Sequence, residues 1–270
     1  MADNVKSLHP RSKHNNEYDF ERLVKANQAL SQYVHEAKSG RQSIDFHNAK
    51  AVVELNKALI LHYYNLSYWS IPQGYLCPGV PGRAEYLHKL SDLLFESNGN
   101  KLPKSNSIQG LDIGTGSSLI YPIIAISDYC WRMVASEYDK KSVDSAKQII
   151  TKNEFLSGKV ELRIQENAIQ IFEDIIKPDD YFDFTMCNPP FFSSQSDAVH
   201  ASSRKKRNLK QEPTKDNNFQ GSSNELWCDG GEYVFVRNMI KESQSFNTSC
   251  YWYTSLISVS YTHLTLPTKA

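Results

Sequence analysis

Residues 108–118 read IQGLDIGTGSS, a short apolar strand that runs into a glycine-containing turn and then into the start of a helix. Glycine adopts the left-handed backbone conformations that such a turn needs and lets a ligand approach the main chain closely. The first turn of a helix also has unpaired N–H groups that can bind a polar ligand. We therefore expect Asp112, Gly114 and Gly116 to form part of a ligand site.

Strands and helices alternate on the C-terminal side of this turn. This pattern predicts an α/β domain with a doubly wound, mostly parallel sheet that binds its ligand at the carboxyl ends of the strands. The predicted strands are 108–113, 131–136, 160–164, 182–187 and 250–258. One predicted helix follows the glycine turn and ends at 127, and two others span 140–153 and 232–242.

The first 105 residues have a different pattern. Apolar residues recur with a period close to 3.6 over 19–35 and 48–64, which predicts two helices. A further helix is predicted over 83–96, before a linker rich in Ser, Asn, Gly and Pro. We therefore divide the chain into a helical region, 1–105, and an α/β domain, 106–258. Residues 259–270 (VSYTHLTLPTKA) break the pattern and resemble translated vector sequence, so we expect a non-native tail.

The bulk composition narrows the protein class. The chain has 270 residues, with 30 basic and 30 acidic side chains, and no apolar run approaches the ~20 residues of a membrane helix. With no secretory signal, we expect a cytoplasmic protein without a membrane partner. Five scattered cysteines without a CxxC pair, and histidines without partners at ligand spacing, argue against disulfides and against a metal site.

Two stretches are locally basic. Residues 201–211 contain five Lys or Arg and no acid, and residues 6–14 are also basic without an acid. Such runs can contact nucleic acid, although a solvated loop explains them equally well when they are taken alone. The candidate RNA contacts are Lys6, Arg11, Lys13, Arg204, Lys205, Lys206 and Arg207.

Glu137 ends the second predicted strand, 23 residues after Gly114. A carboxylate at this place can accept hydrogen bonds from the ribose hydroxyls of an adenosine ligand. The same spacing fits NAD and S-adenosylmethionine, and a structural turn without a ligand also remains open.

The segment CNPPFF, residues 187–192, directly follows the fourth predicted strand. The side-chain oxygen of Asn188 and the carbonyl of Pro189 can accept the two N–H bonds of an adenine N6 amine, which positions that poor nucleophile. Pro189 and Pro190 stiffen the backbone, and Phe191 offers a stacking face for a flipped base. The alternative is a Pro-Pro strand end followed by two core phenylalanines. The order of strand, glycine turn and Glu137 favours adenine-N6 methylation.

These motifs, Asp112–Gly116, Ser136-Glu137 and Cys187–Phe192, resemble the class I adenine-N6 RNA methyltransferases. Three N-terminal stretches, LHPRSKH (8–14), SIDF (43–46) and GYLCPGVPGRAEY (74–86), look like the bacterial enzymes that methylate one adenine of 23S ribosomal RNA. Eukaryotic relatives that act on small nuclear RNA match these stretches less closely. The resemblance covers about residues 8–258.

The resemblance implies a Rossmann-like fold, S-adenosylmethionine as cofactor, and 23S ribosomal RNA or a pre-ribosomal particle as partner. It also implies that 1–105 binds RNA and covers the cofactor. Arg83 would pair with the cofactor carboxylate, Gly114 and Gly116 would line its amino-acid end, Glu137 would hold the ribose, and Asn167 would lie near its adenine. The family continues past the fifth strand with a helix and a β-hairpin, so we expect the last strands of the sheet to be missing.

Other functions remain open at this stage. The site chemistry also fits methylation of another RNA, of DNA adenine or of a protein glutamine, and the fold alone would fit a noncatalytic RNA-binding module. Residues 225–232 (ELWCDGGE), with Trp227, Gly230 and Gly231, either return to the active site or only form a helix start.

Overall fold

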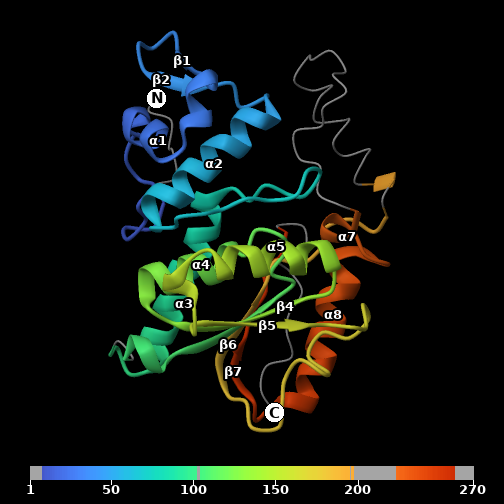
Figure 1. Ribbon diagram of the computed structural model, residues 1–270. Helices are drawn as coiled ribbons and strands as arrows, with labels where there is room; N and C mark the ends of the chain where they lie inside the picture. Colours follow the sequence, from blue (N-terminus) through green and yellow to red (C-terminus); the bar gives the residue numbers. More distant parts are fainter. Residues whose placement is uncertain (1–7, 102–103, 195, 198–222, 259–270) are drawn as a thin grey trace, which may run out of the picture.

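The computed structural model describes residues 8–101, 104–194, 196–197 and 223–258 (Figure 1). In this part of the chain five strands form one sheet in the order β5-β4-β3-β6-β7, and every neighbouring pair is parallel. The predicted doubly wound α/β fold is confirmed. The strands are β3 (Gln109–Ile113), β4 (Arg132–Glu137), β5 (Val160–Ile164), β6 (Phe182–Cys187) and β7 (Cys250–Tyr253).

The register of the three central strands brings the motifs together. Ile113 at the end of β3 lies opposite Ser136 of β4 on one side and opposite Cys187 of β6 on the other. The residues that follow these ends, Gly114, Glu137 and Asn188, must therefore meet at one edge of the sheet. The direction of winding reverses at β3, which is where ligands bind in open α/β sheets.

Helices cover both faces of the sheet (Figure 1). The helices α3 (Val80–Ser97), α4 (Ile120–Tyr129) and α5 (Lys140–Thr151) share one apolar core with β4 and β6. On the other face α8 (Gly231–Ser243) and residues 171–176 pack on a second core. In the central strand, Gly110 has no room for a side chain, because an added Cβ would lie 2.3 Å from the ring of Phe184.

The N-terminal region is only partly the predicted pair of helices. The prediction of one helix over 19–35 is wrong, because α1 (Phe20–Ala26) stops before Asn27. The backbone of Asn27 is extended, and its side-chain amide donates to the carbonyl and to the carboxylate of Glu54, at 2.9 and 2.7 Å. A 3-10 helix (Gln28–Tyr33) and a small antiparallel sheet of β1 (Val34–Glu36) and β2 (Gln42–Ile44) follow. The second helix, α2 (Ala49–Tyr63), agrees with the prediction and is capped by Asn48.

One apolar core continues from α1 and α2 through α3 to the sheet. Tyr86 and Trp252 reinforce this contact, because the Tyr86 hydroxyl lies 2.7 Å from the Thr254 hydroxyl and the Trp252 indole donates to Ser97 at 3.0 Å. The helical region is therefore packed onto the α/β domain and not merely tethered to it. Short helical turns complete the described chain at Ser105–Ser107, Glu154–Leu156, α7 (Ser223–Leu226) and Gln244–Phe246.

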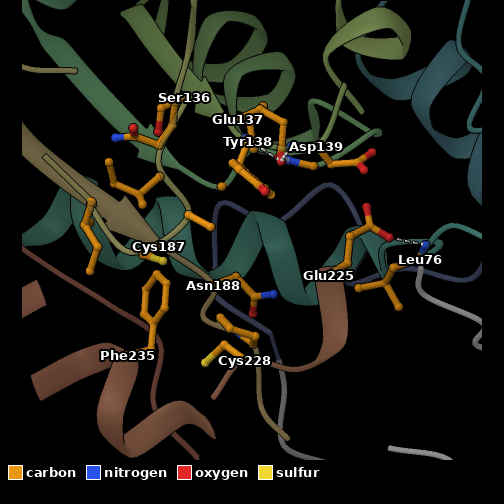
Figure 2. A pocket seen from close by; sticks show the side chains of 18 of the residues that line it. Leu76, Ser136, Glu137, Tyr138, Asp139, Cys187, Asn188, Glu225, Cys228 and Phe235 are labelled. Atoms are coloured by element: carbon orange, nitrogen blue, oxygen red, sulfur yellow. Dashed lines mark hydrogen bonds between the residues drawn. The ribbon is translucent and has the colours of Figure 1, made fainter. Parts of the chain in front are cut away.

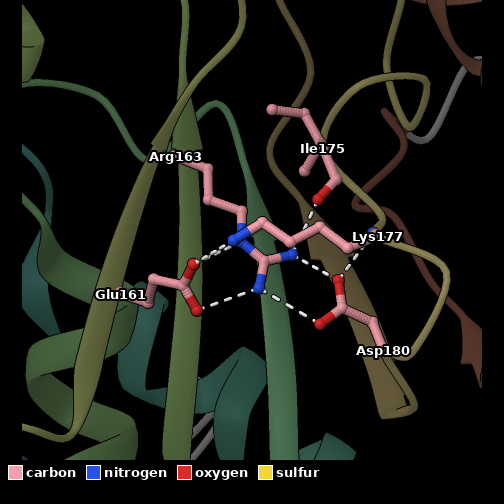
Figure 3. A network of polar contacts seen from close by, with 5 residues as sticks. All are labelled: Glu161, Arg163, Ile175, Lys177 and Asp180. Atoms are coloured by element: carbon pink, nitrogen blue, oxygen red, sulfur yellow. Dashed lines mark hydrogen bonds and ion pairs between the residues drawn. The ribbon is translucent and has the colours of Figure 1, made fainter.

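A buried arginine fixes the far end of the sheet (Figure 3). Arg163 of β5 donates to both carboxylate oxygens of Glu161, at 2.8 and 2.9 Å, and to the carbonyl of Ile175 at 2.7 Å. It also pairs with Asp180, which accepts from the backbone N–H of Lys177 at 2.7 Å. Hydrogen bonds from Arg163 and Lys177 lower the pKa of Glu161 to about 2. This network ties β5 to the turn that leads into β6.

Several predicted features lie outside the described residues: Lys6, the basic residues 204–207 and the tail 259–270. No described helix has the length and apolar character needed to cross a membrane. Within the same residues, no group of three or more His, Cys, Asp or Glu side chains could hold a metal ion.

Candidate active site

A cavity of about 580 Å³ opens at the carboxyl ends of β3, β4 and β6 (Figure 2). The glycine turn, the end of β4 and the start of the CNPPFF segment form its floor. Its other walls come from the loop before α3, from residues 165–171 and from the chain around α7 and α8. Of the predicted site residues, Arg83, Gly114, Gly116, Glu137, Asn188 and Pro190 line it.

The glycine turn is held against the neighbouring strand. Gly114 and Gly116 have φ values of 66° and 67°, in the left-handed region that favours glycine. The backbone N–H of Thr115 donates to the carbonyl of Ser136 at 2.9 Å, and that of Gly116 donates to Glu137 Oε2 at 2.7 Å. The turn therefore exposes main-chain atoms to the cavity at a fixed distance from Glu137.

Glu137 organises the end of β4. Its Oε1 accepts from the backbone N–H groups of Tyr138 and Asp139, both at 2.8 Å, and its Oε2 accepts from Gly116. Burial raises the pKa of this carboxyl above its usual range, while the three backbone donors counteract the shift. A carboxylate has about four acceptor directions, so these bonds leave room for one further donor.

Asn188 and Arg83 form a second polar pair in the cavity. Arg83 Nη1 donates to Asn188 Oδ1 at 2.8 Å and to the Tyr121 hydroxyl at 3.0 Å, and its guanidinium lies over the Tyr121 ring, 5.6 Å from the centroid. These contacts fix the orientation of the Asn188 amide. The oxygen keeps a second lone pair, and Arg83 has further N–H groups for an anionic ligand.

The segment 225–232 returns to the cavity. The N–H of Phe192 donates to the carbonyl of Leu226 at 3.0 Å, and the N–H of Cys228 donates back to Phe192 at 3.1 Å. Trp227, Cys228 and Asp229 consequently line the cavity. Both interpretations from the sequence apply, because this segment lines the cavity and also starts a helix, α8, at Gly231 with Gly230 as its N-cap residue.

Four of the predicted catalytic and cofactor-binding residues do not line the cavity. Pro189 and Phe191 flank the residues that do, and the Phe191 side chain is 39% exposed. Asn167 is exposed and accepts from the backbone of Ile169 at 3.1 Å, although Ile169 itself lines the cavity. Asp112 is fully buried beneath the glycine turn.

The buried Asp112 should make stability depend on pH. Burial raises the pKa of Asp112 to about 7, and the negative charge of Glu137 adds to this effect. Below the usual pKa of 3.8 the carboxyl is protonated in both folded and unfolded chains. Between pH 3.8 and about 7 the unfolded chain has lost this proton while the folded chain keeps it, so the loss of stability builds up over this range and is complete above pH 7.

We therefore expect Asp112→Asn to gain stability relative to the unchanged protein by on the order of 4 kcal/mol between pH 4 and pH 8. Urea unfolding of both proteins at a series of pH values measures this difference. A difference that stays constant with pH would contradict the expectation.

The two described members of the N-terminal basic run make intramolecular ion pairs. Arg11 contacts Asp92 at 2.5 Å and donates to the carbonyl of His88 at 3.0 Å. Lys13 pairs with Asp128 at 2.6 Å. These contacts fasten residues 9–14 to α3 and α4, so a structural role accounts for both charges, and RNA contact by Arg11 and Lys13 stays a prediction.

Sequence reasoning missed Glu225, Leu76 and Tyr121 as cavity residues. Tyr121 lies within an apolar helix, where its spacing indicated only core packing. Leu76 lies in the loop before α3 and Glu225 lies in α7, 149 positions later. The backbone N–H of Leu76 joins the two segments by donating to Glu225 Oε2 at 2.8 Å. The acidic residue in the 225–232 motif was the available signal for Glu225.

Comparisons with a family model and with individual relatives point to the same protein family. A family model described as RNA methyltransferase matches residues 2–267. The chain is 48% identical over 253 residues to a protein of Cytophaga hutchinsonii named ribosomal RNA large subunit methyltransferase F, which covers 93% of this chain and 79% of the relative. The protein of the same name from Bacteroides fragilis is 46% identical, with 93% and 85% covered.

Solved structures show the same fold. The hMettl16 catalytic domain in complex with the MAT2A 3′UTR hairpin 1 has a TM-score of 0.75 and 31% identity, over 93% of this chain and 81% of that one. The N-terminal domain of human METTL16 in complex with SAH has a TM-score of 0.70 and 28% identity, over 93% and 83%.

Proposed function

The chain belongs to the RNA methyltransferase family, and from this we propose that it transfers a methyl group from S-adenosylmethionine to the N6 amine of an adenine in 23S ribosomal RNA. The observation that carries the proposal is the strand register, which brings the glycine turn, Glu137 and Asn188 to one cavity.

The residues of the cavity fit this cofactor. An added Cβ at Gly114 would meet no atom within 4 Å, so the main chain there is open to a ligand. Glu137 has room for a ribose hydroxyl, and Arg83 would bind the carboxylate of the amino-acid end. Gly114 and Gly116 would line that end, and Ile169 would approach the adenine more closely than Asn167. When bound, the cofactor supplies an electrophilic methyl group on a sulfonium.

Asn188 would position the acceptor amine. The adenine N6 lone pair is delocalised into the ring, and hydrogen bonds from its two N–H groups to Asn188 Oδ1 and the Pro189 carbonyl would hold the nitrogen in a reactive orientation. Arg83 keeps the Asn188 oxygen fixed before substrate arrives, because it already donates to it at 2.8 Å. Pro189 and Pro190 fix the carbonyl, and Phe191, partly exposed beside the cavity, would stack on the base.

Burial raises the pKa of Cys187 well above its usual range, so this cavity residue stays a neutral thiol. A covalent cysteine intermediate is therefore disfavoured, and this favours direct transfer of the methyl group from the cofactor to a positioned amine.

The relatives support ribosomal RNA as the substrate. The proteins from Cytophaga hutchinsonii and Bacteroides fragilis are named for large-subunit ribosomal RNA, and the hMettl16 domain was solved with an RNA hairpin. A cytoplasmic location would place the chain with that RNA.

Incubation with radiolabelled S-adenosylmethionine and unmodified 23S ribosomal RNA, followed by nucleoside analysis, tests the proposal. We expect the label in N6-methyladenosine. Label in another nucleoside would reject adenine-N6 chemistry. Label only with small nuclear RNA, DNA or a protein glutamine would move the substrate to that class. The absence of both label and cofactor binding would leave a noncatalytic RNA-binding module.

A further inference from the structure

We propose that Tyr121 is a positioning residue: it holds the Arg83 guanidinium in one orientation, so that this arginine can bind the cofactor carboxylate and fix the Asn188 oxygen at the same time. The inference rests on the proposed function, because it takes S-adenosylmethionine as the ligand and Asn188 as the residue that binds the acceptor amine. Its basis is a buried tyrosine hydroxyl that accepts a hydrogen bond from a cavity arginine.

The position of Tyr121 is fixed by the fold around it. Tyr121 is the second residue of α4, shortly after the glycine turn, and it is only 4% exposed. Its ring meets the ring of Tyr86 edge-on, with centroids 5.7 Å apart. The Tyr86 hydroxyl is bonded to the hydroxyl of Thr254, which in turn donates to the carbonyl of Thr185 in β6 at 2.7 Å. Tyr121 therefore offers Arg83 a rigid support that is tied to the central sheet.

The hydroxyl of Tyr121 is explained by its contact with Arg83 and not by packing. A buried hydroxyl is unfavourable unless it is hydrogen-bonded, so phenylalanine would suit a ring that only fills space here. Arg83 Nη1 donates to this hydroxyl at 3.0 Å, and the guanidinium lies over the same ring, 5.6 Å from its centroid. Burial raises the pKa of Tyr121 above its usual range, so the hydroxyl stays neutral and leaves the positive charge of Arg83 uncancelled.

The two contacts of Nη1 determine how the rest of the guanidinium is placed. Nη1 has two hydrogens, and its two acceptors are the Tyr121 hydroxyl and the Oδ1 of Asn188, which lies beside α3 (Figure 2). The other three N–H groups belong to Nε and Nη2, which together can bind a carboxylate with two parallel hydrogen bonds. Because the guanidinium is planar and rigid, two acceptors on Nη1 also set the direction of this pair.

Loss of the hydroxyl should therefore affect both tasks of Arg83. With Asn188 as its one remaining acceptor at Nη1, the guanidinium can turn about that single hydrogen bond. The carboxylate-binding pair then loses its fixed direction, and the Asn188 oxygen loses a fixed donor. A role in packing alone predicts a different result, because it would weaken every ligand of the cavity alike.

Calorimetry and kinetics of Tyr121→Phe test the inference. S-adenosylhomocysteine has the carboxylate, and 5′-methylthioadenosine lacks the whole amino-acid end. We expect the variant to bind S-adenosylhomocysteine about 10-fold more weakly, to bind 5′-methylthioadenosine as the unchanged protein does, and to lose about 10-fold in kcat for RNA methylation.

Tyr129→Phe is the matched control. It makes the same substitution in the same helix and removes a hydrogen bond to His88 at 2.5 Å, but Tyr129 lies outside the lining of the active-site cavity. This variant should leave both affinities unchanged, and also kcat at saturating RNA.

Arg83→Met shows whether the Tyr121 hydroxyl acts through Arg83. In that background, Tyr121→Phe should weaken S-adenosylhomocysteine binding by no more than about 2-fold. The inference is overturned if the full 10-fold loss persists there, if Tyr121→Phe weakens 5′-methylthioadenosine as much as S-adenosylhomocysteine, or if it changes neither affinity nor kcat. If the unchanged protein binds neither ligand and labels no RNA, the proposed function itself fails, and this inference falls with it.

Discussion

Replacing Asn188 with alanine should lower kcat for RNA methylation by at least about 10²- to 10³-fold, the loss typical of removing one preorganised polar group from a catalytic site. The variant deletes the oxygen proposed to accept the adenine N6–H, and no other side chain in the CNPPFF segment can supply one. A radiolabel assay at saturating RNA and S-adenosylmethionine measures the change in kcat.

Cofactor binding separates catalysis from misfolding in this variant. Arg83 loses its 2.8 Å contact to Asn188 but keeps Tyr121, so S-adenosylhomocysteine binding should change far less than kcat. Asn247→Ala is the matched control, since Asn247 is exposed and lies outside the cavity lining. If Asn188→Ala retained nearly full kcat, the positioning role would be wrong.

The parts of the site that the sequence predicted are those that follow strand ends. A parallel sheet places the carboxyl ends of its strands at one edge, so Gly114, Glu137 and Asn188 could be brought together from the order of strands alone. The register pairs of Ile113 with Ser136 and Cys187 realise that expectation.

The parts that the sequence did not predict depend on contacts between segments that are far apart in the chain. Nothing in the local pattern around Leu76 or Glu225 indicates that they meet, because their hydrogen bond joins segments 149 positions apart and depends on tertiary packing. The ion-pair partners of charged residues could not be predicted from the sequence for the same reason. Arg11 and Lys13 look like free basic residues in the sequence, whereas Asp92 and Asp128, which pair with them, come from helices far along the chain.

Local periodicity also failed where tertiary contacts dominate. The apolar spacing over 19–35 suits one helix, yet Asn27 leaves helical geometry to bond Glu54 of α2. A buried side chain with two specific partners outweighs the small free-energy differences of helix propensity.

Glu137→Ala should weaken S-adenosylhomocysteine binding by about 100-fold or more, because it removes a charge-assisted hydrogen bond to ribose and also disorganises the turn that lines the amino-acid end. Three backbone N–H groups, of Gly116, Tyr138 and Asp139, lose their acceptor together. The melting temperature should fall as well, since buried donors without a partner destabilise the fold. Calorimetry below the melting transition measures the affinity, and differential scanning measures the stability.

Glu137→Gln distinguishes the two contributions. The amide oxygen can still accept from Tyr138 and Asp139, which preserves the end of β4, but the amide nitrogen cannot accept from Gly116 or from a ribose hydroxyl. This variant should keep most of the stability and lose most of the affinity, whereas Glu137→Ala loses both. If Glu137→Gln bound S-adenosylhomocysteine as tightly as the unchanged protein, Glu137 would serve only to shape the turn, and the ribose contact would have to come from another cavity residue.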